Sequence, residues 1–189
     1  MSSVSSATSL ATLIACQSSL IYDFASRQKV GGITMNFFIW QQLPTLSPAM
    51  LHSHVDWINK RQLEISFTAR DMVAFARDLG DNDAPFQWDA DRRAVIRAEL
   101  DALFFHLYGI SREDTDYILD TFPIVKRKDE AKYGTYRTKD LVLAEYDRMA
   151  EAGVSLDNPL IDGENYTSTL NPPPGHGPRH PAAAQSEEA

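Results

Sequence analysis

Residues 90–108, ADRRAVIRAELDALFFHLY, are the stretch that decides the fold. The large apolar residues in it recur at intervals of three and four, which predicts a helix with one apolar stripe facing a core. Asp89 is suited to cap the first turn of this helix, and Gly109 is suited to end the last turn. The stripe consists of Ile96, Leu100, Leu103, Phe104, Leu107 and Tyr108.

Three more helices are expected around this segment, each with its own start or stop signal. One begins at Ser111, which has Asp114 three residues later as in a capping box, and it is interrupted by Pro123. The other two cover 69–79 and 137–152, where apolar residues at helical spacing are followed by a glycine. Most of the central chain is therefore predicted to be helical.

The N-terminal region is expected to be one amphipathic helix that ends at Gly31 and Gly32, with these glycines as a left-handed cap. Residues 35–48 are rich in aromatic side chains and are expected to form a strand or a buried extended segment. Apolar and polar residues alternate over 63–67, which fits a short strand. These segments predict an α-rich α+β fold with a helical C-terminal module.

The last part of the chain has a different composition. After Leu170 the sequence NPPPGHGPRHPAAAQSEEA contains no large apolar residue, so it offers little surface to offset the entropy of ordering the chain. Residues 164–189 are therefore expected to be a disordered Pro-rich tail. The predicted parts are 1–48, 49–163 and 164–189.

Composition excludes several classes of protein. The 189 residues carry a net charge of −8, which argues against a protein that coats nucleic acid by bulk positive charge. The single cysteine, Cys16, excludes a disulfide framework and a cysteine-rich zinc site. No apolar run reaches the roughly 18 residues that span a bilayer. No Lys or Arg precedes Arg27, so the basic start of an export signal is missing, and a cytoplasmic protein is expected.

Charge is segregated along the chain. Residues 78–120 carry a net charge of −7, whereas residues 124–139 carry +4, and residues 27–29 form a second basic spot. Basic segments of this kind either hold phosphates or form a solvated face paired with acidic helices. Charge alone favours the second interpretation.

No catalytic motif stands out. A dinucleotide-binding glycine motif, a phosphate loop and a nucleophile elbow are all absent from the sequence. His52 and His54 lack a third ligand at a recognisable spacing, so they are expected to lie in a surface loop without a metal. His106 is expected to be a partly buried, hydrogen-bonded residue and not a catalytic base.

Five stretches together carry a resemblance to one family: RQKVGG (27–32), MNFFIWQQLPTLSP (35–48), FTARDMVAFARDLG (67–80), PFQWDADRRAVIRAELDALFFHLYGI (85–110) and DYILDTFPIVKRKDEAKYGTYRTKDLVLAEYD (116–147). In this order they resemble the end of the target-recognition region and the helical C-terminal segment of adenine-specific DNA methyltransferases. The relevant members are the type IIG restriction-modification and phage-defence enzymes. The resemblance runs from about residue 10 to about residue 150.

The resemblance implies a DNA-recognition and scaffold fragment whose partner is double-stranded DNA. In the full-length family the methyl donor is S-adenosylmethionine, but the donor-binding and catalytic motifs of the family do not occur in this chain. We therefore expect no cofactor site, no catalytic residue and no methyl transfer by this chain alone. Two alternatives stay open: a subunit that docks on a separately encoded catalytic chain, and a non-functional gene remnant.

The resemblance also implies which residues contact DNA. Arg27 and Lys29 are expected at phosphates and Gln28 at an adenine edge. Asn36 is either a base reader or a turn residue that binds its own backbone, and the turn role is favoured. A second basic group is expected to brace the DNA backbone: Lys126, Arg127, Lys128, Arg137 and Lys139.

The expected truncation has a consequence for packing. Without the larger recognition sheet of the family, Phe37, Ile39 and Trp40 are expected to leave an exposed apolar patch. We expect such a patch to promote self-association of the isolated chain.

Overall fold

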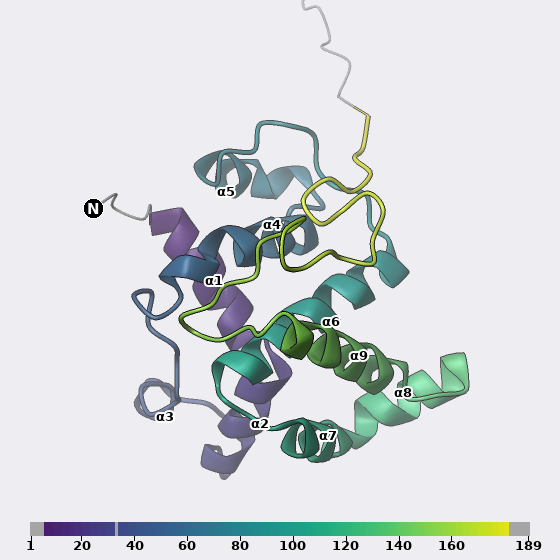
Figure 1. Cartoon of the computed structure of the whole chain (residues 1–189). Coiled ribbons are helices and arrows are strands. Elements are labelled where there is room, and N and C mark those ends of the chain that lie inside the picture. Colours follow the sequence, from purple (N-terminus) through teal and green to yellow (C-terminus); the bar gives the residue numbers. More distant parts are fainter. Residues whose placement is uncertain (1–5, 33, 182–189) are drawn as a thin grey trace, which may run out of the picture.

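The helix predicted over 90–108 is the centre of the structure. In the computed structural model, α6 (Ala90–Leu107) crosses the molecule and α9 (Arg137–Glu151) packs along it (Figure 1). The carboxylate of Asp89 accepts hydrogen bonds from the backbone N–H groups of Asp91 (2.9 Å) and Arg92 (3.0 Å). The predicted helix and its N-terminal cap are both confirmed.

The structure describes residues 6–32 and 34–181, and within these ranges every other regular element is also a helix. None of these helices has both the length and the apolar character needed to cross a lipid bilayer. The other elements are α1 (Ser6–Gln17), α2 (Leu20–Lys29), α3 (Phe37–Trp40), the 3₁₀ turn η1 (His52–His54), α4 (Val55–Ser66), the 3₁₀ turn η2 (Arg70–Met72), α5 (Val73–Asp78), α7 (Arg112–Asp120) and α8 (Pro123–Tyr133).

The start and stop signals of the later helices act as predicted. Ser111 Oγ accepts a hydrogen bond from the Asp114 N–H (3.1 Å) and donates one to the Asp114 carboxylate (2.9 Å), so the capping box of α7 is confirmed. Pro123 occupies the first turn of α8, where its missing N–H costs no hydrogen bond. Gly134 ends α8 at a φ of 78°, a left-handed conformation that favours glycine.

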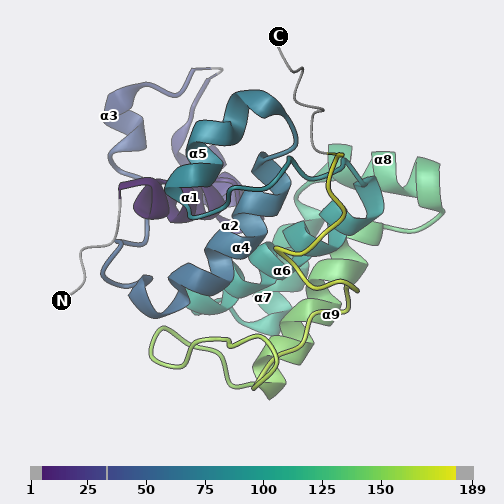
Figure 2. The ribbon, with the colours of Figure 1, turned by 90° about the horizontal axis from the view of Figure 1, so that it is seen from above.

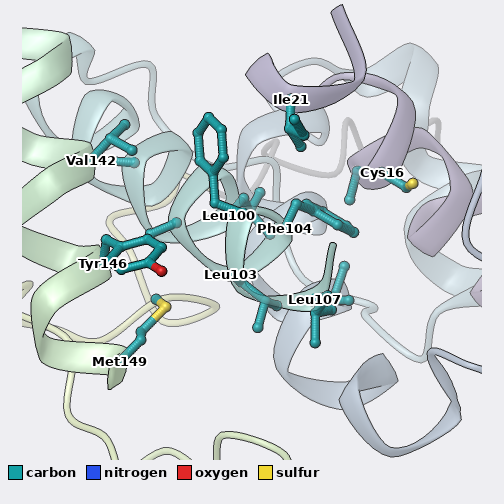
Figure 3. Close-up of a cluster of buried hydrophobic side chains, with 14 of the residues drawn as sticks. Cys16, Ile21, Leu100, Leu103, Phe104, Leu107, Val142, Tyr146 and Met149 are labelled. Atoms are coloured by element: carbon teal, nitrogen blue, oxygen red, sulfur yellow. The ribbon is translucent and has the colours of Figure 1, made fainter. Parts of the chain in front are cut away.

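One hydrophobic core joins the N-terminal helices to the C-terminal ones. α6 lies between α9 on one side and the α1–α2 pair on the other, and its side chains reach both (Figure 3). The boundary predicted at residue 48 therefore divides residues that share one core. The residues at the centre are Cys16, Ile21, Leu100, Leu103, Phe104, Leu107, Val142, Tyr146 and Met149.

The predicted β component is wrong. Among the residues that the structure describes there are only isolated β-bridges and no strand. Residues 63–66 complete α4, because Leu63 and Phe67 are four residues apart and can pack on one side of a helix as well as on one face of a strand. Residues 37–40 form the short helix α3, which lies at the edge of the molecule in both views (Figures 1 and 2).

The N-terminal region also differs from the single helix that was expected. The chain breaks between α1 and α2, where Ser19 caps α2 and its hydroxyl donates to the carbonyl of Cys16 (2.7 Å). α2 then ends at Val30 in an extended conformation. Neither Gly31 nor Gly32 has a positive φ, so the predicted left-handed glycine cap is wrong.

The expectation of a disordered tail is wrong for residues 164–181, and residues 182–189 lie outside the described chain. Residues 154–181, here called the C-terminal strap, run without regular structure across α4, α6 and α9 (Figures 1 and 2). Leu160 and Tyr166 of the strap are buried. Composition did not predict this order, because the strap is held largely by its backbone and by ion pairs and not by apolar side chains.

Buried charged groups on three helices hold the strap. On α6, Arg92 is paired with Glu64 of α4 and donates to the carbonyl oxygens of Pro172 (2.5 Å) and Pro173 (3.0 Å). Glu64 in turn accepts a hydrogen bond from the Gly175 N–H (2.6 Å). The other two groups are Arg61 with Glu99 and Asp162, and Arg148 with Glu145 and Tyr166.

Candidate functional site: a groove lined by α4, α6, α8 and α9

The first group of predicted DNA contacts lies at the C-terminal end of α2. Arg27 is ion-paired with Asp23 (2.6 Å), and its guanidinium lies 4.5 Å from the centre of the Phe122 ring. Gln28 and Lys29 are exposed, and neither side chain has a partner among the described residues. Lys29 is therefore the free cation of this group.

Asn36 has the turn role. Its side-chain oxygen accepts a hydrogen bond from the Ile39 N–H (2.9 Å) and so caps α3. This is the arrangement expected of a residue that closes its own backbone. The oxygen that a base reader would present is thus already engaged.

Most of the second basic group is neutralised by acidic residues. Lys126 is paired with Asp120 (3.6 Å), and Lys139 contacts both Asp116 (2.9 Å) and Asp120 (2.8 Å). In the same group, Arg137 is paired with a carboxylate of α6. The two residues with no partner in the described chain are Arg127 and Lys128, which are both exposed.

The two basic segments, far apart in the sequence, meet in the structure. Arg27 stacks on Phe122, and the carbonyl of Phe122 accepts the first-turn hydrogen bond of α8 from the Lys126 N–H (3.1 Å). The end of α2 therefore lies beside the start of α8. Both segments are recognisable in the sequence, but no local pattern in it places them side by side.

A groove that the sequence did not reveal lies between these helices. Its volume is about 660 Å³, and it is lined by the α1–α2 junction, α4, α6, α8 and α9. A groove of this size is in the range of small-molecule sites. Polar or aromatic residues of the groove lining include Gln62, Ser66, Trp88, Arg93, Arg97, Asp101, Tyr133 and Arg137.

Two guanidinium groups of the groove have no carboxylate partner. Arg93 and Arg97 are one helical turn apart on α6, and neither forms an ion pair within residues 6–32 and 34–181. Burial lowers the pKa of Arg93, and repulsion from Arg97 lowers it further. The available signal in the sequence was this like-charged pair at i and i+4, an unfavourable spacing on a helix unless an anion lies nearby.

Aromatic rings accompany the arginines of the groove. The Arg93 guanidinium lies 3.8 Å from the centre of the Trp88 ring, and 66% of Trp88 is exposed. Arg137 lies 4.6 Å from the centre of the Tyr133 ring and is ion-paired with Asp91 (2.6 Å) in the first turn of α6. Both stacks are therefore near the N-terminal end of α6.

One buried amide in the groove wall is only half satisfied. Gln62 is 4% exposed, and its Nε2 donates to Ser66 Oγ (2.7 Å) while its Oε1 has no partner in the described structure. Turning the amide over exchanges the two ends and leaves the other one unpaired. Buried polar groups without a partner are uncommon, so this amide is suited to meet a ligand.

Asp101 lies in the same wall. Its carboxylate accepts a hydrogen bond from the Leu20 N–H (2.7 Å) at the start of α2. Burial raises the pKa of Asp101 to about 7, although the Leu20 N–H and the charge of Arg97 both oppose this rise. A carboxyl with such a pKa changes charge close to neutral pH.

We expect Asp101→Asn to change how stability depends on pH. In the wild type the pKa of Asp101 is higher in the folded state than its ordinary value of 3.8, so stability is lost as pH rises from about 4 to about 7. Asparagine keeps the hydrogen bond from Leu20 but cannot ionise. The stability of the variant relative to wild type should therefore rise with pH across this window, by up to about 1.4 kcal/mol per pH unit. Urea denaturation at several pH values measures the difference, and a constant difference would contradict the prediction.

His54 and His106 have structural roles, whereas His52 is exposed on η1. His54 is fully buried, which corrects the expected surface loop, and its Nε2 lies 3.0 Å from the carbonyl oxygen of Ser155. His106 Nε2 lies 2.9 Å from the carbonyl oxygen of Tyr146, as expected of a hydrogen-bonded residue. Burial lowers the pKa of both. Within the described ranges, no group of three His, Cys, Asp or Glu residues is arranged to hold a metal ion.

Comparison of the chain with protein-family models, with curated proteins and with solved structures gave no match.

Proposed function

We propose that this protein is a non-catalytic DNA-binding and scaffold module, of the kind that forms the C-terminal part of adenine-specific DNA methyltransferases. The observation that supports it most is the meeting of the two basic segments at the end of α2 and the start of α8. The net charge of −8 disfavours binding by bulk attraction, so contact with DNA must be local. The cytoplasm is the compartment where such a module would act.

The free cations define the proposed contact surface. Lys29, Arg127 and Lys128 are exposed and have no acidic partner in the described chain, so a phosphate can approach them without breaking an ion pair. Arg137 and Lys139 are already paired, and their proposed role is to hold α9 in place. The duplex would therefore lie across the C-terminal end of α2 and the first two turns of α8.

The proposal predicts duplex binding that depends steeply on salt. Each neutralised phosphate contributes about −0.9 to the slope of log affinity against log salt. The triple variant Lys29→Gln/Arg127→Gln/Lys128→Gln should bind a labelled duplex more weakly than wild type. It should also make this slope less negative by about 2 to 3. Fluorescence anisotropy at several salt concentrations measures both quantities.

A control variant that removes two positive charges comes from another surface. Arg70 and Arg77, in the η2–α5 segment, are exposed and lie outside the proposed contact surface, so Arg70→Gln/Arg77→Gln should leave the slope nearly unchanged. A wild-type chain that binds no duplex even at low salt would contradict the proposal. An equal loss in both variants would also contradict it, because the effect would then come from net charge alone.

A second candidate function is docking on a separately encoded catalytic chain. The observation that favours it is α3, where Phe37 is 68% and Phe38 is 72% exposed, and Phe37 stacks on Trp40 at 5.7 Å between ring centres. Exposed aromatic clusters of this kind are typical of protein interfaces. Docking through α3 would depend little on salt, in contrast to binding through the α2–α8 surface.

A further inference from the structure

The groove lined by α4, α6, α8 and α9 is a second surface, separate from the duplex contacts proposed above. We propose that it binds a single nucleotide, with the phosphate between Arg93 and Arg97 and the base stacked on Trp88. The nucleotide is either free or an unpaired member of a strand, because both present the same phosphate and planar base. The inference does not require that the α2–α8 surface binds duplex DNA.

The charge of the groove calls for an anion. Arg93 and Arg97 repel each other across one helical turn, and neither forms an ion pair in the described structure, although the charge of Glu64 acts favourably on Arg93. Guanidinium groups bind phosphate through two parallel N–H donors, a geometry that a planar fork provides and an ammonium does not. Arg93 is held in place because its Nη1 donates to the carbonyl of Ile65 (2.7 Å). A phosphate between the two arginines would remove their repulsion.

Acidic residues also line the groove, and none of them forms an ion pair with Arg93 or Arg97 in the described chain, although the charge of Arg97 acts on Asp101. Asp129 accepts a hydrogen bond from the Thr138 N–H (2.6 Å), and Asp101 accepts one from the Leu20 N–H (2.7 Å). Asp91 is engaged with Arg137 (2.6 Å). Asp91 is thus neutralised by Arg137, whereas Arg93 and Arg97 form no ion pair within the described residues.

The aromatic residues specify a planar group beside the phosphate. Trp88 precedes α6 by two residues, is stacked with Arg93 on one side and remains 66% exposed. Nucleobases stack on exposed aromatic rings with little dependence on their identity. Because Arg93 contacts both the tryptophan and the proposed phosphate position, base and phosphate would lie one nucleotide length apart or less.

The half-satisfied amide supplies a polar contact. Gln62 lines the groove, is nearly fully buried, and keeps one amide end without a partner in the described chain. Nucleobases carry both donors and acceptors on their edges, so either orientation of the amide finds a partner. An apolar anion would leave this amide end unpaired, and the amide therefore favours a nucleotide over a fatty acid or another apolar anion.

The test is a titration of the full chain with adenosine 5′-monophosphate, adenosine, inorganic phosphate and a short single-stranded oligonucleotide. Isothermal calorimetry gives the affinities. We expect the monophosphate to bind more tightly than adenosine or phosphate alone. Arg97→Gln should weaken the monophosphate about tenfold and leave adenosine nearly unchanged, since it removes one phosphate contact. Trp88→Ala should weaken the monophosphate and adenosine alike, by roughly tenfold.

The affinities measured in this titration identify the source of the nucleotide or overturn the proposed site. An oligonucleotide that binds at least ten times more tightly than the monophosphate would identify an unpaired strand as the source, and equal affinities would identify a free nucleotide. The absence of binding by every nucleotide at low salt would overturn the proposal. Inorganic phosphate that binds as well as the monophosphate would also overturn it, because the base would then play no part.

Two controls keep the result interpretable. Arg97 is exposed and forms no ion pair within the described residues, so a thermal melt of Arg97→Gln should match wild type. Arg70→Gln/Arg77→Gln should bind the monophosphate normally. Duplex affinity of the Arg97→Gln variant is measured in parallel. If the protein binds the nucleotide but not the duplex, only the proposed DNA-binding function is contradicted. If it binds the duplex but not the nucleotide, only the nucleotide site is contradicted.

Discussion

Replacement of Arg61 by methionine is expected to lower the free energy of unfolding by about 3–5 kcal/mol. Arg61 and Glu99 are fully buried and 2.7 Å apart, and Arg61 also binds Asp162 of the strap at 2.9 Å. The guanidinium lies 3.3 Å from the centre of the Trp57 ring. Methionine fills much of the space but leaves the Glu99 carboxylate without its cation. Urea denaturation followed by circular dichroism measures the loss.

A double variant separates lost charge from lost packing. In Arg61→Met/Glu99→Leu the uncompensated, fully buried carboxylate of Glu99 is gone, and only that of Asp162, which is partly exposed, is left without its cation. Buried ion pairs replaced by apolar residues are often neutral in stability. The double variant should therefore recover most of the stability lost in Arg61→Met. If the free energy of unfolding of Arg61→Met lies within about 1 kcal/mol of the wild-type value, Arg61 does not anchor the strap in the way described.

Phe104→Ala is expected to cost about 3–5 kcal/mol of stability, since it leaves a cavity in a core that has little freedom to collapse. Phe104 is fully buried on α6 between α9 and the α1–α2 pair (Figure 3). Because one core spans these helices, α1, α2, α6 and α9 should unfold together. Denaturation is measured by circular dichroism and by reaction of the buried thiol of Cys16 with a thiol reagent.

The two probes distinguish one core from two. Coincident transitions in wild type and in Phe104→Ala are expected, with the midpoint shifted to lower urea in the variant. Thiol reaction at a clearly lower urea concentration than the loss of helicity would show that α1 and α2 unfold separately. Tyr117, which is exposed on α7, provides the control: Tyr117→Ala should change stability by less than about 0.5 kcal/mol.

The candidate site was only partly visible in the sequence. The basic segments at 27–29 and 124–139 were identified from composition, because charge segregation is a property of the sequence itself. Charge alone also favoured their pairing with acidic helices, but it did not identify the partners, because the acids that neutralise Lys139, Asp116 and Asp120, lie on another helix. Arg93 and Arg97 were counted within an acidic stretch, and their lack of an ion pair in the described chain depends on which helices line the groove.

Local signals determined the helices that carry them. The caps at Asp89 and Ser111 and the apolar stripe of α6 act within one or two turns, so the sequence alone placed α6, α7 and α9. Tertiary structure decided the rest. The aromatic segment 37–40 is short and has no neighbouring strand in the described chain, so it forms a helical turn. The strap is ordered by Arg61, Glu64 and Arg92, whose burial depends on residues about 80 to 110 positions away, and no local pattern encodes contacts at that separation.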